Sequence, residues 1–535
     1  MAVPFYTFMG MNMQIIKNKW MKEKKEILCV ETPIESHQLE NKNSLVQDVF
    51  HKDDSKYGVA IDLGTTTIVV ALYDLETKVC LQQCSQKNRQ SQWGSDVMMR
   101  LMHCQQGREE KLHQMVINQI ETMITELIQK IHHESGENCN PNQSNPEADW
   151  NKNQPVQATV WNKNQPAQAA DQNKNQTSQE IRVKKIVSVG NTTMCHIFLN
   201  EDTSRLAGSP FKPAYQGTWR GIGKQIGMST YAEAEVIVLP GVDAHVGADA
   251  VSAGTEQRIS SKENVVLIDI GTNAEMILSE KGAWKVCSTP AGPAFEGMEI
   301  QDGMRGEKGA ICGYHIAKQT GNILIDVLTN KEDSALTNPL GICGSGLVDI
   351  VAALVKSGVV QQDGYLLTAE EAKEKDIPKY LWTRLRRKNP SGLAGSEENY
   401  YVVAEGTDYE IQLTQEDIRQ FQLAKASVQA GLKVLLLEQR ISLSEIDQIL
   451  IAGVFGSVLS IASATAVGLL PSLDQNRIQV VGNAARRGAA LALLDEGWVI
   501  QMEQNAVMAE HVELAQNEDF QKEFLAAMSL RPWEF

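Results

Sequence analysis

Two segments far apart in the chain combine residue types that can bind a phosphorylated ligand. VAIDLGTTTIVVAL at 59–72 matches VLIDIGTNAEMIL at 266–278, and each copy places an aspartate and a Gly-Thr turn between two apolar runs. Glycine lets the backbone approach an anion closely, and successive N–H groups in such a turn form a concave donor site for phosphate. One copy alone would fit an ordinary hairpin equally well, but the matched pair predicts two phosphate-binding turns.

Side chains of both copies add to this predicted site. Asp62 and Asp269 hold the same place at the ends of their strands, and two carboxylates would repel phosphate unless a divalent cation lay between them. Mg²⁺, held largely through its waters by one or two carboxylates and phosphate oxygens, fits this arrangement. The glycines and hydroxyl donors of the two turns are Gly64, Thr65, Thr66 and Thr67 in the first copy, and Gly271 and Thr272 in the second.

A third segment, DQILIAGVFGS at 447–457, is typical of a strand that runs into a turn between two glycines and then into a helix. Gly453 and Gly456 would let a flat, apolar adenine ring lie against the backbone. Strand–glycine–helix turns are common, so this segment supports a nucleotide site only because it follows the two phosphate turns.

These residues need strands and lobes to position them. The pattern at 57–78 predicts strand, turn and strand, and apolar residues at helical spacing predict a helix over 109–133. We expect an α/β fold in which two similar lobes face each other across a cleft. Segment 134–180, rich in Asn, Gln and Pro, carries a degenerate NKNQ repeat and is predicted to be disordered. The expected parts are an extension at 1–56, a first lobe at 57–255 that contains this insertion, a second lobe at 256–500 and a tail at 501–535.

The composition excludes several classes of protein. The chain has 535 residues, with 50 Lys and Arg against 66 Asp and Glu and a formal charge of −16, which argues against a nucleic-acid-binding protein. Nine cysteines without any C-x-x-C pair favour free thiols over a disulfide framework or a zinc site. We find no secretory leader, and the uncharged stretch 449–471 is broken by glycines, so the sequence predicts a cytoplasmic protein without a membrane segment.

The order of the motifs resembles the superfamily of acetate and sugar kinases, heat-shock chaperone ATPases and actin (ASKHA), with its duplicated ribonuclease H-like lobes. More narrowly, the chain resembles the ATP-dependent reductive activators of corrinoid proteins of the RACo type. The segments that carry this resemblance are GVAIDLGTTT (58–67), NRQSQWGSDVMMRL (88–101), VGNTTMCHIFL (189–199), PGVDAHVGADAVSAG (240–254), LIDIGTNAEM (267–276), TPAGPAFEGMEIQDGMRGEKGAI (289–311), GICGSGLVD (341–349), LTQEDIRQFQLAKA (413–426), IAGVFG (451–456) and VGNAARRGAALAL (481–493).

The resemblance implies an ATPase that promotes the reduction of a corrinoid protein from inactive Co(II) to Co(I). ATP and Mg²⁺ are the implied cofactors, a corrinoid protein is the implied partner, and a homodimer is one option for its assembly. By this resemblance, Asp62 and Asp269 would hold Mg²⁺ or its water. Thr65, Thr66, Thr272 and Asn273 would contact phosphates, and Gly453, Val454 and Gly456 would line the adenine site.

Further polar residues have two readings each. Asn191 and Thr192 can reach into the cleft or cap a helix, and Asp243 and Asp249 can position water, connect the lobes or act as caps. Glu296, Glu299 and Arg305 are candidates for lobe closure only.

One feature departs from the resemblance. Activators of this type usually carry an iron–sulfur domain, whereas residues 1–56 contain Cys29 alone, so no cluster is expected and the electron must come from a separate reductase or ferredoxin. Two other functions stay open. A small-molecule kinase of the same superfamily would use Asp243 or Asp269 as its general base, and an ATP-gated binding module would not turn over.

Overall fold

The structure is a computed structural model. It describes residues 56–94, 96–136, 182–209, 211–262, 264–317, 321–329, 338–389, 397–406, 409–453 and 458–533. The predicted extension, apart from Lys56, and nearly all of the predicted disordered insertion lie outside the described residues, as do Val454 and Gly456.

The first lobe is built on a six-stranded sheet. Its first three strands along the chain pair antiparallel, β4 and β6 then add parallel to β1, and β5 pairs antiparallel with β6. In spatial order the strands are β3 (Cys80–Lys87), β2 (Thr67–Asp74), β1 (Lys56–Leu63), β4 (Arg182–Gly190), β6 (Glu235–Val238) and β5 (Trp219–Ile222). The predicted strand–turn–strand at 57–78 is therefore confirmed. The turn is shorter than the predicted Gly-Thr-Thr-Thr, because Thr67 already pairs with Lys87 as the first residue of β2.

The second lobe repeats this arrangement. Three antiparallel strands come first, and β16 and β17 then add parallel to β7 in the same positions. In spatial order the strands are β17 (Ile478–Gly482), β16 (Gln448–Ala452), β7 (Asn264–Ile270), β8 (Ala274–Glu280), β9 (Ala283–Thr289) and β18 (Glu510–His511). This repeated order confirms the predicted α/β fold with duplicated lobes.

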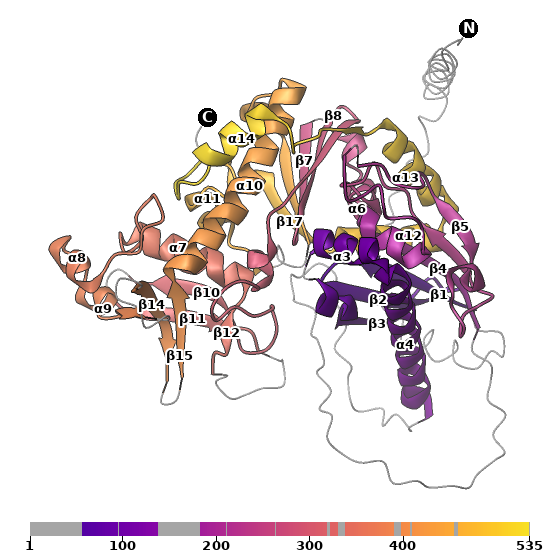
Figure 1. Cartoon of the computed structure of the whole chain (residues 1–535), viewed down its shortest axis with the longest axis horizontal. Coiled ribbons are helices and arrows are strands. Elements are labelled where there is room, and N and C mark those ends of the chain that lie inside the picture. The colour runs from indigo at the N-terminus through magenta and orange to yellow at the C-terminus, as the bar shows by residue number, and fades with distance from the viewer. Residues whose placement is uncertain are drawn as a thin grey trace, which may run out of the picture. The chain divides into compact units, whose positions relative to one another are not determined.

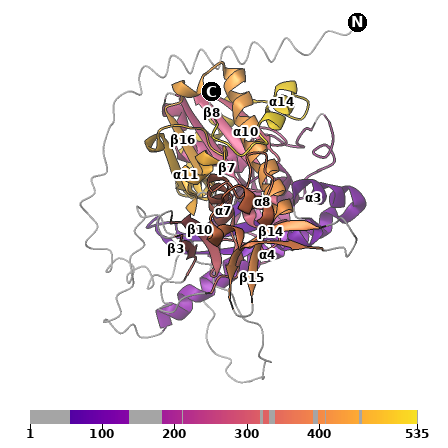
Figure 2. The same ribbon diagram turned by 90° about the vertical axis from the view of Figure 1, so that its left-hand side faces the viewer.

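Helices cover both sheets, which explains why the central strands are continuous apolar runs rather than alternating ones. In the first lobe, α4 (Glu109–Gly136) lies along β2 and β3, as Figure 1 shows, and it confirms the helix predicted over 109–133. In the second lobe, α10 (Gln415–Gln439) lies along β8 and β9 (Figure 2). The other helices of the two lobes are α3 (Val97–His103), α5 (Thr192–Leu199), α6 (Ala248–Glu256), α7 (Gly344–Lys356), α11 (Ile461–Ala466), α12 (Ala484–Leu494), α13 (Glu496–Met508) and α14 (Glu518–Ala526).

Helix α12 comes late in the chain yet packs on β1 and β4 of the first lobe and against α6. At the crossing of α6 and α12, a Cβ on Gly488 would lie 2.2 Å from Ser252 Oγ, so only glycine fits. The Ser252 hydroxyl donates to the Ala485 carbonyl at 2.8 Å, and Arg487 Nε donates to Glu256 at 2.8 Å. These contacts hold a strand of the first phosphate motif against the C-terminal part of the chain.

Two small sheets extend the second lobe between β9 and α10. Their elements are β10 (Ala310–Ile316), β11 (Ile323–Val327), β12 (Gly341–Ile342), β13 (Leu385–Lys388), β14 (Glu398–Glu405), β15 (Glu410–Thr414), α8 (Ala369–Glu374) and α9 (Lys379–Trp382). In the ranges that the structure describes, no helix is both long enough and apolar enough to cross a membrane.

Candidate functional site

The two Gly-Thr turns come together in the structure. The first turn, Gly64–Thr66, joins β1 to β2, and the second turn, Gly271–Asn273, joins β7 to β8. The hydroxyl oxygens of Thr66 and Thr272 lie 3.3 Å apart although 206 positions separate them in the chain. The duplicated strand order explains this meeting, because both turns follow the first strand of their sheets.

All three carbonyl groups of the first turn accept hydrogen bonds from other parts of the chain. Asn88 Nδ2 donates to the Gly64 carbonyl at 3.0 Å, and the Asn88 N–H donates to the Thr66 carbonyl at 2.8 Å. Arg100 donates to the Thr65 carbonyl, and Arg305 Nη2 donates to the Thr66 carbonyl at 3.2 Å. In a trans peptide the N–H points away from the C=O. The N–H groups that follow these carbonyls are therefore turned away from the supporting side chains.

Arg100 is an unusual support because its side chain is fully buried, with 0% exposure. It comes from α3, and its Nη1 also contacts the Gln90 amide oxygen at 3.3 Å and the Met194 sulfur at 2.8 Å. Burial lowers the pKa of Arg100 to about 10, while nearby carboxylates, Glu296 among them, favour its charged form. A positive charge therefore lies directly beneath the first turn.

The second turn has a different environment. The Thr272 hydroxyl donates to Glu296 Oε1 at 2.7 Å, and the Gly271 N–H donates to the Asn273 carbonyl at 2.9 Å within the turn. Glu296 comes from η5 (Pro293–Glu296), the short 3-10 helix after β9. This turn is therefore tied to a carboxylate rather than to a cation.

Four carboxylates lie near the two turns and interact electrostatically: Asp62, Asp249 and Asp269 are partly buried, and Glu275 is buried. Burial raises the pKa of Asp62, and it raises the pKa of Asp269 to about 7 with help from the charges of Asp62 and Asp249. Burial and the neighbouring Asp62 charge also raise the pKa of Asp249 to about 7, and burial raises that of Glu275 well above its ordinary value. Like charges confined in this way are stabilised by a bound cation.

Whether these carboxylates can bind Mg²⁺ depends on how many direct ligands the ion needs from the protein. Within the described ranges, no cluster of three His, Cys, Asp or Glu side chains has the geometry to hold a metal ion. Mg²⁺ bound with a nucleotide needs only one or two carboxylates, because waters and phosphates supply the other ligands. Asp62 and Asp269 satisfy that requirement.

Asp62 is fixed by a residue from the other end of the chain. Asn483 Nδ2 donates to Asp62 Oδ2 at 2.6 Å, and Asn483 Oδ1 accepts from the Arg486 N–H at 2.8 Å as the N-cap of α12. This hydrogen bond lowers the pKa of Asp62 and partly offsets the effect of burial.

Gly453, predicted at the adenine turn, follows β16 and approaches Asp269 closely. Its φ is 91°, and a Cβ would lie 2.7 Å from Asp269 Oδ1, so glycine is required on both counts. The third motif therefore reaches the carboxylates of the turns.

The two readings of Asn191 are both correct. Its Oδ1 caps α5 by accepting from the Met194 N–H at 2.9 Å, while its Nδ2 donates to Thr65 Oγ1 at 2.9 Å. The Thr192 hydroxyl donates to the Asp243 carbonyl. The Asp243 side chain contacts His511 rather than either turn, with His511 Nδ1 3.1 Å from Asp243 Oδ2.

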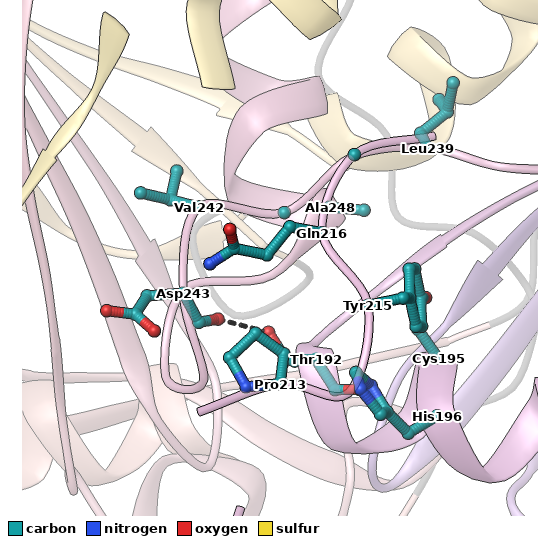
Figure 3. Close-up of a pocket in the computed structure, with 12 residues that line it drawn as sticks. Thr192, Cys195, His196, Pro213, Tyr215, Gln216, Leu239, Val242, Asp243 and Ala248 are labelled. Carbon is teal, nitrogen blue, oxygen red and sulfur yellow. Dashed lines mark hydrogen bonds between the residues drawn. The ribbon is translucent and has the colours of Figure 1, made fainter. Parts of the chain in front are cut away.

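Asp243 instead borders a small pocket in the first lobe. Figure 3 shows its carboxylate pointing away from Thr192, while its backbone carbonyl accepts the Thr192 hydroxyl. His196 and Tyr215, which also line this pocket, stack on one another with ring centroids 4.6 Å apart. Burial raises the pKa of Asp243, but the hydrogen bonds from His511 and the Ala244 N–H, together with the charges of His511 and His245, outweigh this effect and the net shift is downward.

Sequence reasoning missed several functional candidates. Asn88, Arg100 and Asn483 were not singled out, although an arginine within the apolar run VMMRLM is itself a signal of a buried, partnered charge. Glu296 and Arg305 were expected to take part in lobe closure only, and both contact the turns.

Almost the whole described chain matches two regions of one known protein family. The C-terminal domain of RACo, the ASKHA domain, matches residues 263–534. The RACo middle region matches residues 57–140 and 151–262.

Three individual proteins are similar over most of the chain. Corrinoid activation enzyme RamQ from Eubacterium limosum is 27% identical over 94% of this chain and 76% of its own. The [Co(II) methylated amine-specific corrinoid protein] reductase from Methanosarcina barkeri is 23% identical over 88% of this chain and 77% of its own. The solved structure of a reductive activator for corrinoid, iron–sulfur protein has a TM-score of 0.71 and 28% identity, and it covers 90% of this chain and 67% of its own.

Proposed function

Because the chain belongs to the RACo family, we propose that it binds and hydrolyses ATP to promote the reduction of a corrinoid protein from Co(II) to Co(I). The electron comes from a separate reductase or ferredoxin, and the reaction takes place in the cytoplasm. The observation that carries the ATP part is the contact between the two turns, Thr66 to Thr272, beside the partly buried Asp62 and Asp269. The choice of a corrinoid protein as the partner is supported by the names of the three similar proteins, which all refer to corrinoid proteins.

Each predicted residue has a role in this proposal. Asp62 and Asp269 hold Mg²⁺ or its water, and bound Mg²⁺ would offset the negative charge of phosphates and carboxylates. The N–H groups of the first turn, turned away from Asn88 and the two arginines, point to the phosphates. The residues assigned to phosphates are Gly64, Thr65, Thr66, Thr67, Gly271, Thr272 and Asn273, with Asn191 and Thr192 behind them, and those assigned to adenine are Gly453, Val454 and Gly456.

Nucleotide binding affects both lobes because residues of both contact the first turn. Arg305 and Thr272 belong to the second lobe, and both reach Thr66 of the first. A ligand that binds one lobe arrangement better shifts the population toward it. That shift is the means by which ATP would favour a corrinoid-protein conformation that accepts an electron.

The first experiment is calorimetry with Mg-ATP on the full chain and on Asp62→Ala and Asp269→Ala. We expect the unchanged protein to bind and both variants to lose binding, since each removes one carboxylate from the shared site. Binding that survives in both variants would contradict the two-turn nucleotide site. The catalytic role that we also propose for the two aspartates is read from ATP turnover in Asp62→Asn and Asp269→Asn, at ATP concentrations that saturate each variant.

The corrinoid step is tested by cobalt spectroscopy. A Co(II) corrinoid protein is mixed with a reductant and this protein, and the Co(I) yield is compared with and without ATP. We expect more Co(I) with ATP. An equal yield under both conditions would contradict the proposed activation.

The pocket beside Asp243 favours a small-molecule kinase as the second candidate function. Asp243 would be the general base that takes a proton from a substrate hydroxyl in this pocket. A phosphorylated product in a metabolite screen, lost in Asp243→Asn, would support the kinase over the activator.

A further inference from the structure

Glu296 has one carboxylate oxygen that the fold uses and one that it does not. Oε1 accepts the Thr272 hydroxyl at 2.7 Å. Oε2 is buried and has no hydrogen-bond partner among the residues that the structure describes. A carboxylate oxygen that has lost water without gaining a donor is costly, and an oxygen in this state calls for an explanation such as a water or a ligand.

The Glu296 carboxylate contacts the second turn and lies close to the first. A Cβ on Gly271 would lie 3.8 Å from Glu296 Oε1, so the carboxylate lies against the second turn. The same Thr272 that donates to Glu296 also reaches Thr66 of the first turn at 3.3 Å. Electrostatic interaction with Arg100, beneath the first turn, places Glu296 within range of that turn as well.

Other carboxylates near the turns differ in this respect. Asp62 Oδ2 accepts from Asn483, and Glu275 Oε1 accepts from Ser288. Among the described acidic residues that contact either turn through a hydrogen bond, Glu296 combines a fixed oxygen with a buried, unpartnered one. A water is the smallest donor that can complete it.

We propose that Glu296 is the general base for ATP hydrolysis, which rests on the proposed function. Oε2 accepts a hydrogen bond from a water beside the terminal phosphate. The water oxygen forms a bond to the γ-phosphorus while the bond from that phosphorus to the bridging oxygen of ADP breaks. The proton of the water passes to Glu296 and then to solvent, and ADP and phosphate are the products.

A different role for Glu296 is that of a counter-ion for Arg100, and the two roles predict different results. A counter-ion would change the affinity for ATP or the stability of the fold when its charge is removed. A general base would change the turnover of bound ATP, because binding does not require proton transfer.

The test is Glu296→Gln, which keeps the shape of the side chain and removes its basicity. We expect turnover to fall by about 100-fold or more, with the affinity for Mg-ATP and the urea midpoint unchanged. After gel filtration of the protein loaded with Mg-ATP, the variant should retain ATP where the unchanged protein contains ADP. Glu307→Gln is the matched control, because Glu307 is exposed further along the same segment, and this variant should hydrolyse ATP normally.

The outcomes separate this inference from the function on which it rests. Normal turnover in Glu296→Gln, or a loss of affinity that accounts for the loss of turnover, would overturn the general base alone. Failure of the unchanged protein to bind ATP would overturn the proposed function and the general base with it. If Glu296→Gln does not fold, Glu296→Asp replaces it, and we expect slower turnover because the shorter carboxylate no longer reaches the water.

Discussion

The first and second turns share a motif and differ in what supports them. Hydrogen-bond donors hold the carbonyls of the first turn, and one of them is the fully buried cation Arg100. The second turn donates its Thr272 hydroxyl to a carboxylate, Glu296. A turn with a cation beneath it favours a bound anion, whereas a turn beside a carboxylate favours a proton acceptor near the same ligand. We therefore expect the two similar turns to have separate tasks.

The difference in the residues that support the two turns arises in the segment that follows the third strand of each lobe. In each lobe the segment that follows the third strand supports the turn, which is Asn88 to Arg100 after β3 and Glu296 after β9. Five strands keep the same order in both lobes, and the sixth strand differs, because β5 lies beside β6 whereas β18 lies beside β9. The connecting segments, rather than the sheets, therefore determine which side chains contact each turn.

The largest effect in this comparison is expected for Arg100→Met. Removing the cation beneath the first turn should weaken Mg-ATP binding by about 10- to 100-fold, the size expected when a hydrogen bond to a charged group is lost. The loss should be larger for ATP than for ADP and smallest for AMP, because it depends on the charge of the phosphates. Methionine is apolar and of similar length, so the fold should survive, as replacements of buried ions by apolar residues often do.

Calorimetry with the three nucleotides measures this series. Arg108→Met is the control, because Arg108 is at the surface, stacked on Trp93, and touches neither turn. An equal loss of affinity for ATP and AMP would mean that Arg100 stabilises the fold but does not attract phosphates. The charge of Arg100 would then not distinguish the first turn from the second.

Local patterns were sufficient to predict the turns and their strands. The apolar runs around Asp62 and Asp269 carry the strand signal themselves, and the helix over 109–133 has a clear apolar face. Thr67 was assigned to the turn because a run of three threonines gives no sign of where pairing resumes, which depends on the partner Lys87.

The supports could not be predicted for a different reason. Asn483 and Asp62 are 421 positions apart, and nothing in the local sequence of α12 indicates that its N-cap will face β1. Arg100 and Glu296 lie in connecting segments without a periodic pattern. Their partners are set by where those segments cross the sheet, which is a property of the tertiary fold.

The next effect concerns the carboxylate of the first turn. Asn483→Ala removes the donor that lowers the pKa of Asp62, so this pKa, already raised by burial, should rise further. A higher pKa keeps Asp62 protonated up to a higher pH. The pH at which Mg-ATP binding is half-maximal should therefore move upward, with a loss of affinity of about 10-fold on the acidic side, corresponding to about one pKa unit.

Titration calorimetry at several pH values checks this shift. Asn505→Ala is the control, since Asn505 donates to Thr255 Oγ1 at the helix crossing and does not touch Asp62. A loss of affinity that is the same at every pH would show that Asn483 acts on packing rather than on the protonation of Asp62.

Matched substitutions in the two turns give a third, smaller effect. Thr272→Val removes the hydroxyl that fixes Glu296, so ATP turnover should fall by about 10-fold, within the range for loss of one hydrogen bond to a charged group. Thr66→Val removes the hydroxyl of the first turn that faces Thr272 and should weaken binding more than turnover. Steady-state turnover and calorimetry on both variants separate these effects, and identical behaviour would mean that the turns do not differ in task.

The smallest effect is expected for Arg305→Gln. Arg305 crosses from the second lobe to the Thr66 carbonyl at 3.2 Å, but it is partly exposed and shares that carbonyl with the Asn88 N–H. An exposed charge with a redundant partner contributes about 1 kcal/mol at most, so the affinity for Mg-ATP should fall only a few-fold and should become less sensitive to salt. A loss as large as that of Arg100→Met would reverse the interpretation. The first turn would then depend on the second lobe for its charge, and closing the lobes would be a condition for binding ATP rather than a consequence of it.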